Sequence, residues 1–246
     1  MTARARSAGI ALIAGVIALA ACGSPEPSDN RPEQAFTRIT CGGPPAFHPS
    51  VLDQEGGAER GDDPAAATLR AALAPANQDS DILPDTGWIA VTRSESMVKY
   101  LARGGDGPGL GIVTVVRRDG QWTFDRSGRC ELLPEIREGL DLAMFRVAPG
   151  QQLTPEITDV EVLVQELACN SGQDARARVR VDRILPGDSS VIVVIATVPR
   201  GGAQDCQNNP ETPFLLELPE PLGDRVLLDG YSIPPRDATE CHRFAC

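Results

Sequence analysis

Short runs of apolar and β-branched residues, separated by Gly, Pro, Asn and charged positions, recur along most of the chain. Runs of this length between turn residues predict β-strands. In the first half, the predicted strands are residues 36–41, 86–94, 96–103, 111–118 and 121–127. In the second half, they are residues 157–167, 175–184, 190–199 and 213–221.

Two local signals add a turn and a helix to this pattern. Asp119-Gly120 separates two predicted strands and predicts a tight hairpin, because Gly readily adopts the positive φ that such a turn requires. The segment DDPAAATLRAALA predicts the one helix of the chain, which ends before Pro75. Within it, Asp63 can cap the N-terminus, Pro64 suits the first helical position, and the Ala and Leu content has a high helix propensity.

Alternation within residues 175–184 predicts a half-buried strand. One face carries Ala177, Val179 and Val181, and the other carries Arg178, Arg180 and Asp182. We interpret the charged face as solvent-exposed rather than as a ligand site. The run SVIVVIATV is apolar on both faces, so it predicts a central strand and favours an antiparallel sandwich over a single open sheet.

These elements predict a mainly β chain with one helix, arranged as two small β domains that are each stapled by a disulfide. The N-terminal domain, residues 35–150, is expected to be a β-meander with the helix, and it closes with the alternating run LDLAMFRV and the turn Pro149-Gly150. The C-terminal domain, residues 151–236, is expected to be an antiparallel, sandwich-like unit. Residues 237–246 are expected to form a tail that contains two cysteines.

The first 34 residues follow a different pattern. Arg4 and Arg6 precede a run without charge from Ala8 to Ala21, which is the layout of an export signal. That run is shorter than the roughly 20 apolar residues that a transmembrane helix needs. Residues 22–34 are polar and contain several prolines, so we expect a flexible tether there.

The end of the apolar run, Leu19-Ala20-Ala21-Cys22, resembles the lipobox of bacterial lipoproteins. The resemblance implies that residues 1–21 are a cleaved signal peptide and that Cys22 becomes the N-terminus, with a diacylated sulfur and an acylated amine. Two or more acyl chains anchor a protein stably where one chain is marginal. We therefore expect a lipid-anchored protein on the extracytoplasmic face of the cell membrane. An ordinary cleaved signal with Cys22 in a disulfide is the alternative.

The net charge of the chain disfavours nucleic acids and anionic lipid surfaces as partners. The whole chain has a net charge of −11, and removal of residues 1–21 takes away two arginines and no acidic residue, which leaves −13. Nucleic-acid binding depends on Lys and Arg side chains that neutralise phosphates, so we expect no nucleic acid as a partner. The same balance disfavours adsorption to anionic lipid, so membrane contact is expected through the acyl chains.

Seven cysteines occur in the chain, and six remain if Cys22 carries lipid. An even number in an exported protein predicts disulfides, but six cysteines allow many pairings and the sequence does not choose among them. We expect the pairing that keeps each bond within one expected unit, which joins Cys41 to Cys130, Cys169 to Cys206 and Cys241 to Cys246. No C-x-x-C pair occurs, and only His48 and His242 supply imidazole, so we expect no metal site and no cofactor.

Several longer segments of the sequence together carry a resemblance to known proteins. They are CGGPPAFHPS, GAERGDDPAAATLRAALA and LPDTGWIAVTRS in the first half, and ELACNSG and DCQNNPETPFLLELPEPLGDRVLLDG in the second. Together they resemble a group of actinobacterial secreted or lipid-anchored proteins of unknown function. The resemblance runs from about Cys41 to Pro235 and implies no activity. It implies that Cys169 and Cys206 share one domain and that Cys41 and Cys130 share the other.

Two functions remain open. The sequence has no G-x-S-x-G motif, no strand-to-helix phosphate loop and no distinctive carboxylate pair, so we predict no catalytic residues. The favoured hypothesis is a non-catalytic binding module for an envelope protein or wall polymer. Its candidate recognition residues are Asn208, Asn209, Pro210, Asp224 and Arg225, because rigid scaffolds present binding residues on loops, although these residue types are also typical of turns. The alternative is an envelope hydrolase that uses a carboxylate acid and base.

Overall fold

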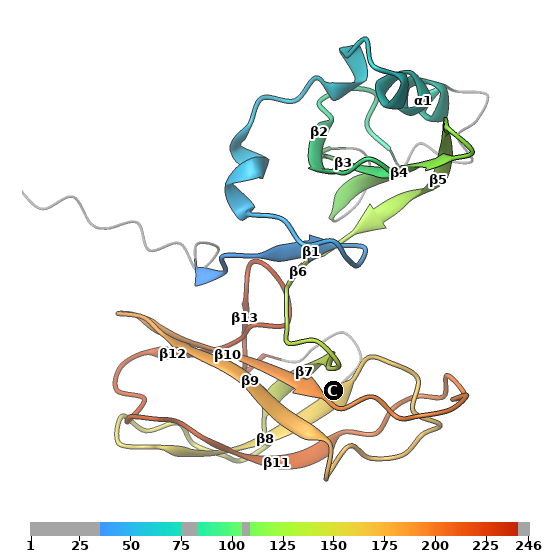
Figure 1. The fold of residues 1–246 in the computed structure, drawn as a ribbon. Coiled ribbons are helices and arrows are strands. Elements are labelled where there is room, and N and C mark those ends of the chain that lie inside the picture. The colour runs from blue at the N-terminus through green and yellow to red at the C-terminus, as the bar shows by residue number, and fades with distance from the viewer. Residues whose placement is uncertain (1–34, 75–82, 105–108, 241–246) are drawn as a thin grey trace, which may run out of the picture.

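The computed structural model describes residues 35–74, 83–104 and 109–240. They form strands β1 to β13, one α-helix and two short 3₁₀ helices, in two halves joined by a small central sheet (Figure 1). The prediction of a mainly β chain with one helix is confirmed. Within the described ranges, no helix has the length and apolar character that a membrane span requires.

The first half is a four-stranded antiparallel sheet with a helix on it. The strands follow chain order: β2 (Ile89–Arg93), β3 (Met97–Ala102), β4 (Leu110–Arg118) and β5 (Gln121–Cys130). Asp119 and Gly120 join β4 to β5 with positive φ at both residues, as the sequence predicts. The helix α1 (Pro64–Leu73) begins after Asp63, whose Oδ1 accepts hydrogen bonds from the backbone N–H groups of Ala65 and Ala66.

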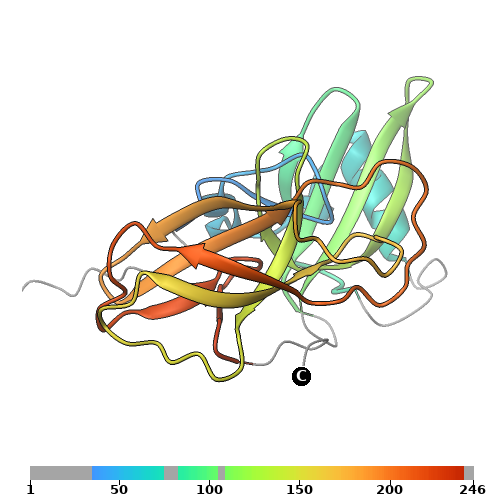
Figure 2. The same cartoon turned by 90° about the horizontal axis from the view of Figure 1, so that it is seen from below.

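The apolar side of α1 packs on one face of this sheet (Figure 2). Leu69 of the helix lies in a core with Trp88, Tyr100, Val113 and Val115, and all five side chains are fully buried. Fully burying one such side chain stabilises the folded state by about 1.5–3 kcal/mol. The helix is therefore held by the sheet as well as by its own propensity.

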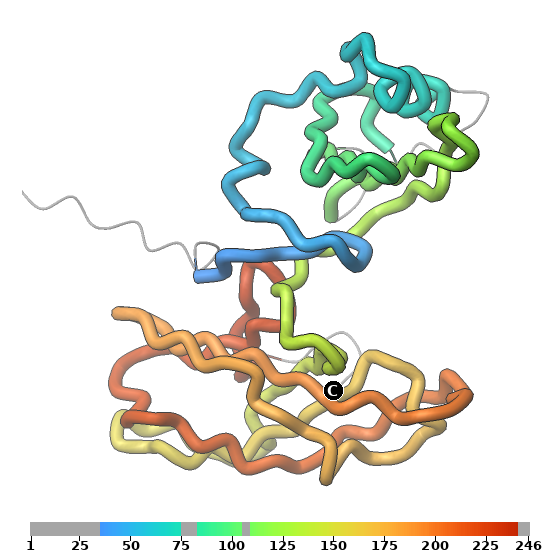
Figure 3. The backbone as a smooth tube through the Cα atoms, viewed as in Figure 1, coloured from blue at the N-terminus to red at the C-terminus, as the bar shows by residue number. Residues whose placement is uncertain are grey.

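A short central sheet lies between the halves. It pairs β1 (Ile39–Cys41) with β6 (Leu132–Pro134) in antiparallel register. From β1 the chain rises through η2 (Pro49–Asp53) and η3 (Ala58–Arg60) to α1, and it returns from β5 through β6 to the second half (Figure 3). The central sheet thus pairs the strand that enters the first half, β1, with the strand that leaves it, β6.

The second half is a seven-stranded mixed sheet. Its strands are β7 (Asp141–Val147), β8 (Asp159–Glu166), β9 (Val179–Pro186), β10 (Ser190–Thr197), β11 (Thr212–Glu217), β12 (Val226–Asp229) and β13 (Arg236–Asp237). They follow the order β11-β8-β7-β10-β12-β13, and β9 pairs with the other edge of β10. The sheet folds over itself, so that β9, β10 and β12 face β8 and β11 across a core (Figure 1).

This arrangement modifies the expected antiparallel sandwich in one respect. Every pairing within the sheet is antiparallel except that of β10 with β12, which is parallel. The parallel pair arises because the chain crosses from β11 to β12 instead of returning through a hairpin. β12 and β13 are short, and no strand was expected at either segment.

Two strands, β7 and β13, do not follow the domain boundaries expected after residues 150 and 236. β7 ends at Val147, within the expected N-terminal domain 35–150, yet it pairs with β8 and β10 of the second sheet. The reason is packing, since Ala143, Phe145 and Val147 point into the second core. Asp237, expected to begin the tail, pairs with Leu228.

A middle core joins the two halves. Along β10, Val191, Val193 and Ile195 pack into the core of the second sheet, whereas Ile192 and Val194 pack into a separate cluster. That cluster also contains residues of the central sheet and of the first half, namely Phe36, Ile39, Cys41, Phe47, Val91, Leu101 and Ile112. The strand is therefore apolar on both faces because each face covers a different core.

Two disulfides link described cysteines, and both join the predicted partners. Cys41 is bonded to Cys130, which ties β1 to the end of β5, and Cys169 is bonded to Cys206, which ties two loops at one end of the second sheet. Structural disulfides are typical of oxidising, extracytoplasmic compartments. The expected lipidation site Cys22 and the expected pair Cys241–Cys246 lie outside the described residues.

Candidate functional site

A cavity of about 820 Å³ lies where the first half, the central sheet and the second half meet. Its wall is built from β1, η2, the start of β4, the junction of β5 with β6, and the turn after β12. The lining residues include Phe36, Ile39, His48, Ser50, Leu52, Asp53, Arg103, Leu110, Glu131, Leu132, Ile233 and Pro234. Ligand sites are typically concave, form at domain junctions, and combine apolar walls with a few polar groups.

The inner wall is apolar. Phe36, Ile39 and Ile233 belong to the middle core and are almost fully buried, while Leu110 and Leu132 pack against the same core with part of their surface exposed. The cavity is therefore an opening into the core that joins the halves. An apolar part of a ligand would be removed from water there, which contributes about 25 cal/mol for each Å² buried.

The rim on the η2 side carries a histidine with a defined hydrogen-bond pattern. His48 precedes η2, and its Nδ1 accepts a hydrogen bond from Ser50 N at 3.2 Å and lies 2.8 Å from Ser50 Oγ. Because Nδ1 accepts, the neutral ring carries its proton on Nε2. Together with Asp53, at the end of the same short helix, His48 gives this rim one donor and one charged acceptor.

The opposite rim is a cluster around Glu131. Arg236 of β13 forms an ion pair with Glu131, the Tyr231 hydroxyl donates to Glu131 Oε2 at 3.5 Å, and the Arg236 guanidinium lies 5.7 Å from the centre of the Tyr231 ring. Burial raises the pKa of Tyr231, and the nearby Glu131 adds to the effect, so its hydroxyl keeps its proton at neutral pH. This cluster fixes the side of the cavity that belongs to the second half.

The turn behind this rim is held by a buried carboxyl group. Asp229, at the end of β12, is fully buried; its Oδ2 accepts from Phe145 N at 3.2 Å, and its Oδ1 accepts from Tyr231 N at 3.1 Å. Burial raises the pKa of Asp229 to about 7. Further along the turn, Ile233 N donates to Leu132 O of β6 at 2.9 Å, which ties the second half to the central sheet.

A buried ammonium group supports the turn after β1. Lys99 of β3 is fully buried, and its Nζ donates to the backbone oxygens of Gly43, Pro44 and Cys41 at 2.6, 3.1 and 3.2 Å. Three N–H groups meet three carbonyl groups, so every donor of the ammonium is satisfied. Burial, followed by the field of Arg126, lowers the pKa of Lys99 to about 8.

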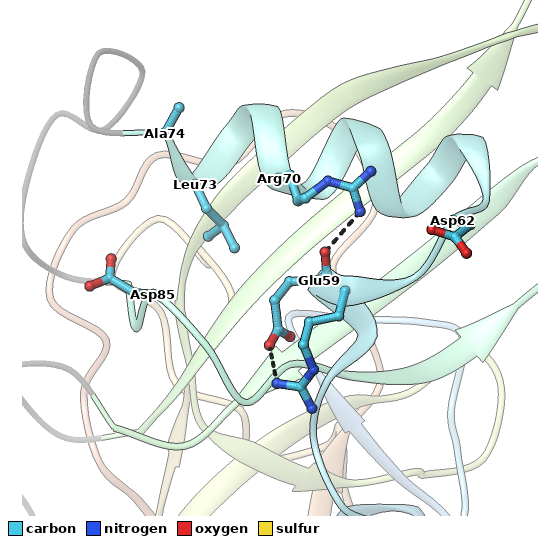
Figure 4. A pocket seen from close by; sticks show the side chains of 7 residues that line it. Glu59, Asp62, Arg70, Leu73, Ala74 and Asp85 are labelled. Atoms are coloured by element: carbon cyan, nitrogen blue, oxygen red, sulfur yellow. Dashed lines mark hydrogen bonds and ion pairs between the residues drawn. The ribbon is translucent and has the colours of Figure 1, made fainter.

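A second hollow, of about 540 Å³, lies beside α1 and bears on the hydrolase hypothesis. Figure 4 shows its three carboxylates, Glu59, Asp62 and Asp85, at separate points of the wall and pointing in different directions. Glu59 accepts hydrogen bonds from Gly87 N and Trp88 N, so it anchors the start of β2. These groups build the wall rather than converge on one point.

Arginines complete the same hollow. Arg70 donates to the backbone oxygens of Glu59 and Gly61, and Arg60 pairs with the Glu59 carboxylate (Figure 4). Among the described residues, no group of three or more His, Cys, Asp or Glu side chains is placed to hold a metal ion.

The structure does not bring the candidate recognition residues together. Asn208, Asn209 and Pro210 precede β11, near its pairing with Val164, whereas Asp224 and Arg225 lie beyond the other end of β11 and directly before β12. Strands rise about 3.3 Å per residue, so the length of β11 separates the two groups. They do not form one surface.

Two of these residues have roles within the fold. Asn209 is buried, and its Nδ2 donates to Glu166 O at 2.9 Å and to Ala168 O at 2.7 Å. Arg225 donates to Leu222 O at 2.8 Å and to Pro221 O at 2.6 Å. Asn208, Pro210 and Asp224 are exposed.

The charged face predicted for residues 175–184 is not simply solvated. Arg178 pairs through both guanidinium nitrogens with the buried carboxylate of Glu166. Burial acts to raise the pKa of Glu166, but hydrogen bonds from Arg178 and Asn170 outweigh it and lower the pKa. Asp182 is likewise covered by Arg137 and Arg183. Ion pairs therefore cover part of this face, whereas Arg180 stays exposed, and the alternation alone does not reveal the partners.

Sequence reasoning missed most residues of the cavity. His48 stands out in the sequence only as one of two histidines, and Glu131, Leu132 and Ile233 carry no signal of their own. The available signal was the segment CGGPPAFHPS, whose end lies on the rim. Comparison of the chain with protein-family models, curated protein sequences and solved structures finds no match.

Proposed function

We propose that the protein is a non-catalytic binding module on the extracytoplasmic face of the cell membrane, anchored by lipid on Cys22, and that the cavity between its halves receives the ligand. The observation that carries the proposal is the cavity itself, with its apolar inner wall and a rim of His48, Asp53, Arg103 and Glu131. Such a site suits a segment of an envelope protein or wall polymer with an apolar group and hydrogen-bonding neighbours.

Two further features support this proposal. The disulfides Cys41–Cys130 and Cys169–Cys206 suit an oxidising location. Of the carboxylates beside α1, Glu59 accepts backbone hydrogen bonds, and the three carboxylates point in different directions, so that hollow does not favour the hydrolase alternative.

Site-specific photo-crosslinking in the native envelope tests the binding site. A benzophenone amino acid at Asp53, on the exposed rim, is expected to give a reproducible adduct, whereas the same group at Leu215, on the exposed face of β11, is expected to give none. The substitution Leu52→Trp narrows the cavity and is expected to reduce the Asp53 adduct at least fivefold. Adducts of equal yield at both positions, or none at Asp53, would contradict the proposal.

Mass spectrometry of the purified mature protein tests the anchor separately. The N-terminal peptide is expected to begin at Cys22 and to carry the added mass of two or three acyl chains. Substitution of Cys22→Ser is expected to release the protein from the membrane fraction. An unmodified N-terminal peptide would rule out the lipid anchor while leaving the cavity proposal intact.

A further inference from the structure

The turn between β12 and β13 forms part of the cavity wall. Ile233 and Pro234 line the cavity, and Ile233 N donates to Leu132 O, which is another lining residue. Ser232 is buried, and its Oγ donates to Pro234 O at 3.1 Å. The position of this turn therefore sets the shape of the cavity on the side of the second half.

Asp229 holds the turn from behind. Its two carboxyl oxygens accept from different segments, since Phe145 N belongs to β7 and Tyr231 N belongs to the turn. The side chain thus joins the turn to the sheet, next to Gly230 N, which donates to Val193 O at 2.8 Å. A buried carboxyl group in such a position links the geometry of the turn to its own charge, because the charged form favours water and the neutral form tolerates burial.

The charged and polar groups around Asp229 determine how readily its carboxyl group ionises. On β13, Arg236 is the cation whose field favours the ionised form, and the Tyr231 hydroxyl keeps its proton. The strands on either side present Phe145 from β7 and Val193 from β10, which carry no charge. Burial is the largest influence and raises the pKa of Asp229 to about 7 from an ordinary value of 3.8.

We infer that Asp229 is a positioning residue for the cavity wall, and that ionisation of its carboxyl group favours release of the turn at residues 230–236 and opening of the cavity. The sign follows from linkage. A released turn exposes the carboxyl group to water, so the open form holds the proton less tightly than the closed form. Rising pH therefore favours the open form. The effect on ligand binding rests on the proposed function, whereas the opening itself does not.

Amide hydrogen exchange measured by NMR tests the opening. After correction for intrinsic exchange rates, the opening constant at the Ile233 amide is expected to rise by up to about tenfold per pH unit between pH 5 and pH 6.5, which is the limit for one proton. The amide of Leu218, which lies in the core of the second sheet and donates to Thr158 O at 2.7 Å, is the internal control and is expected to open less often than Ile233 at every pH.

Variants separate charge from structure. Asp229→Asn removes the titrating group, so the pH dependence at Ile233 is expected to disappear. Arg236→Gln removes a cation that favours ionisation of Asp229 in the closed form, so the pH at which the opening constant levels off is expected to move upward. Asp224→Asn changes an exposed carboxyl group and is expected to leave the profile unchanged. If Asp229→Asn does not fold, the wild-type and Arg236→Gln profiles still decide the matter.

The result that overturns the inference is a pH-independent opening constant at Ile233, or one equal to that of Leu218, because the turn would then open only with the whole sheet. The Asp53 photo-adduct, measured at pH 6 and pH 8, links the two proposals. A yield that differs at least threefold in the wild type and not in Asp229→Asn supports both. If exchange at the Ile233 amide depends on pH but no Asp53 adduct forms, the binding proposal alone is overturned. If the adduct forms but the exchange does not depend on pH, this inference alone is overturned.

Discussion

Lys99 connects β3 to the turn after β1, because its ammonium donates hydrogen bonds to three backbone carbonyl groups of that turn. A buried carbonyl group without a donor costs about 1–3 kcal/mol. The same turn leads from Cys41 to Phe47, both in the middle core. One side chain therefore stabilises the segment that starts the cavity wall.

Lys99→Met keeps the length of this side chain and removes its donors. We expect the free energy of unfolding in urea to fall by about 2–4 kcal/mol, because several backbone acceptors are left unsatisfied. Arg118→Met is the matched control, since Arg118 is exposed and pairs with Asp125 at the surface. Equal stability of Lys99→Met and the wild type would show that the three hydrogen bonds contribute little.

Asp229 gives the whole protein a pH dependence of defined sign. The folded state keeps its proton up to about pH 7, whereas the unfolded chain releases it near the ordinary value of 3.8. Between those values the folded state binds more protons, so the contribution of Asp229 to the free energy of unfolding falls as pH rises from 5 to 7 and levels off above that. Glu166, whose pKa is lowered, is already ionised in this window.

Urea titrations at pH 5, 6, 7 and 8 measure that slope. We expect a decrease in stability from pH 5 to pH 7 in the wild type and a flat profile in Asp229→Asn. A wild-type profile that rises over this interval would mean that another group dominates.

At the scale of elements, α1 shows how a short helix is fixed at its start. Asp63 caps it with two hydrogen bonds, Pro64 follows, and Leu69 anchors the helix on the sheet. These residues were recognisable in the sequence because capping and helix propensity are local properties. The hairpin at Asp119-Gly120 was predictable for the same reason.

Asp63→Ala is expected to lower the free energy of unfolding by about 1 kcal/mol, through the loss of the cap. The neighbouring Asp62→Ala serves as control, because Asp62 is exposed and the cap remains. Circular dichroism and urea unfolding on both variants measure the difference. If Asp62→Ala lowered the free energy of unfolding more than Asp63→Ala does, Asp63 would not be the capping residue.

Other elements depended on distant partners and were not predictable. β7 was detected as an alternating segment, but its membership of the second sheet follows from packing of Phe145 against residues far along the chain. β12 has only four residues and is stabilised by β10 and by Asp229 rather than by a strong pattern of its own. The cavity was hidden for the same reason, since its wall is assembled from segments that lie up to almost two hundred residues apart, Phe36 and Pro234 among them.

At the scale of the whole molecule, the middle core predicts that the halves unfold together. Ile192 and Val194 of β10 pack with Leu101 and Ile112 of the first half. Both tryptophans, Trp88 and Trp122, lie in the first half, so their fluorescence reports that half alone. Circular dichroism reports the strands of both halves.

Ile192→Ala, in the second half, is therefore expected to shift the fluorescence transition and the circular dichroism transition to the same lower urea concentration. The expected loss is about 2–5 kcal/mol, as for other large-to-small substitutions in a core. Leu216→Ala, in the core of the second sheet, is the comparison that should shift both probes as well. A fluorescence transition that stays unchanged in both variants would show that the halves unfold independently.

The burial of Lys99 also limits how a partner can be found. It is the only lysine in the chain, so the folded protein offers no exposed side-chain amine to succinimidyl esters or aldehydes. Amine-reactive crosslinkers would therefore fail to link a bound partner to this side chain, whatever the affinity of the complex. Carboxyl-directed or light-activated crosslinking chemistry is the appropriate choice for a search for binding partners.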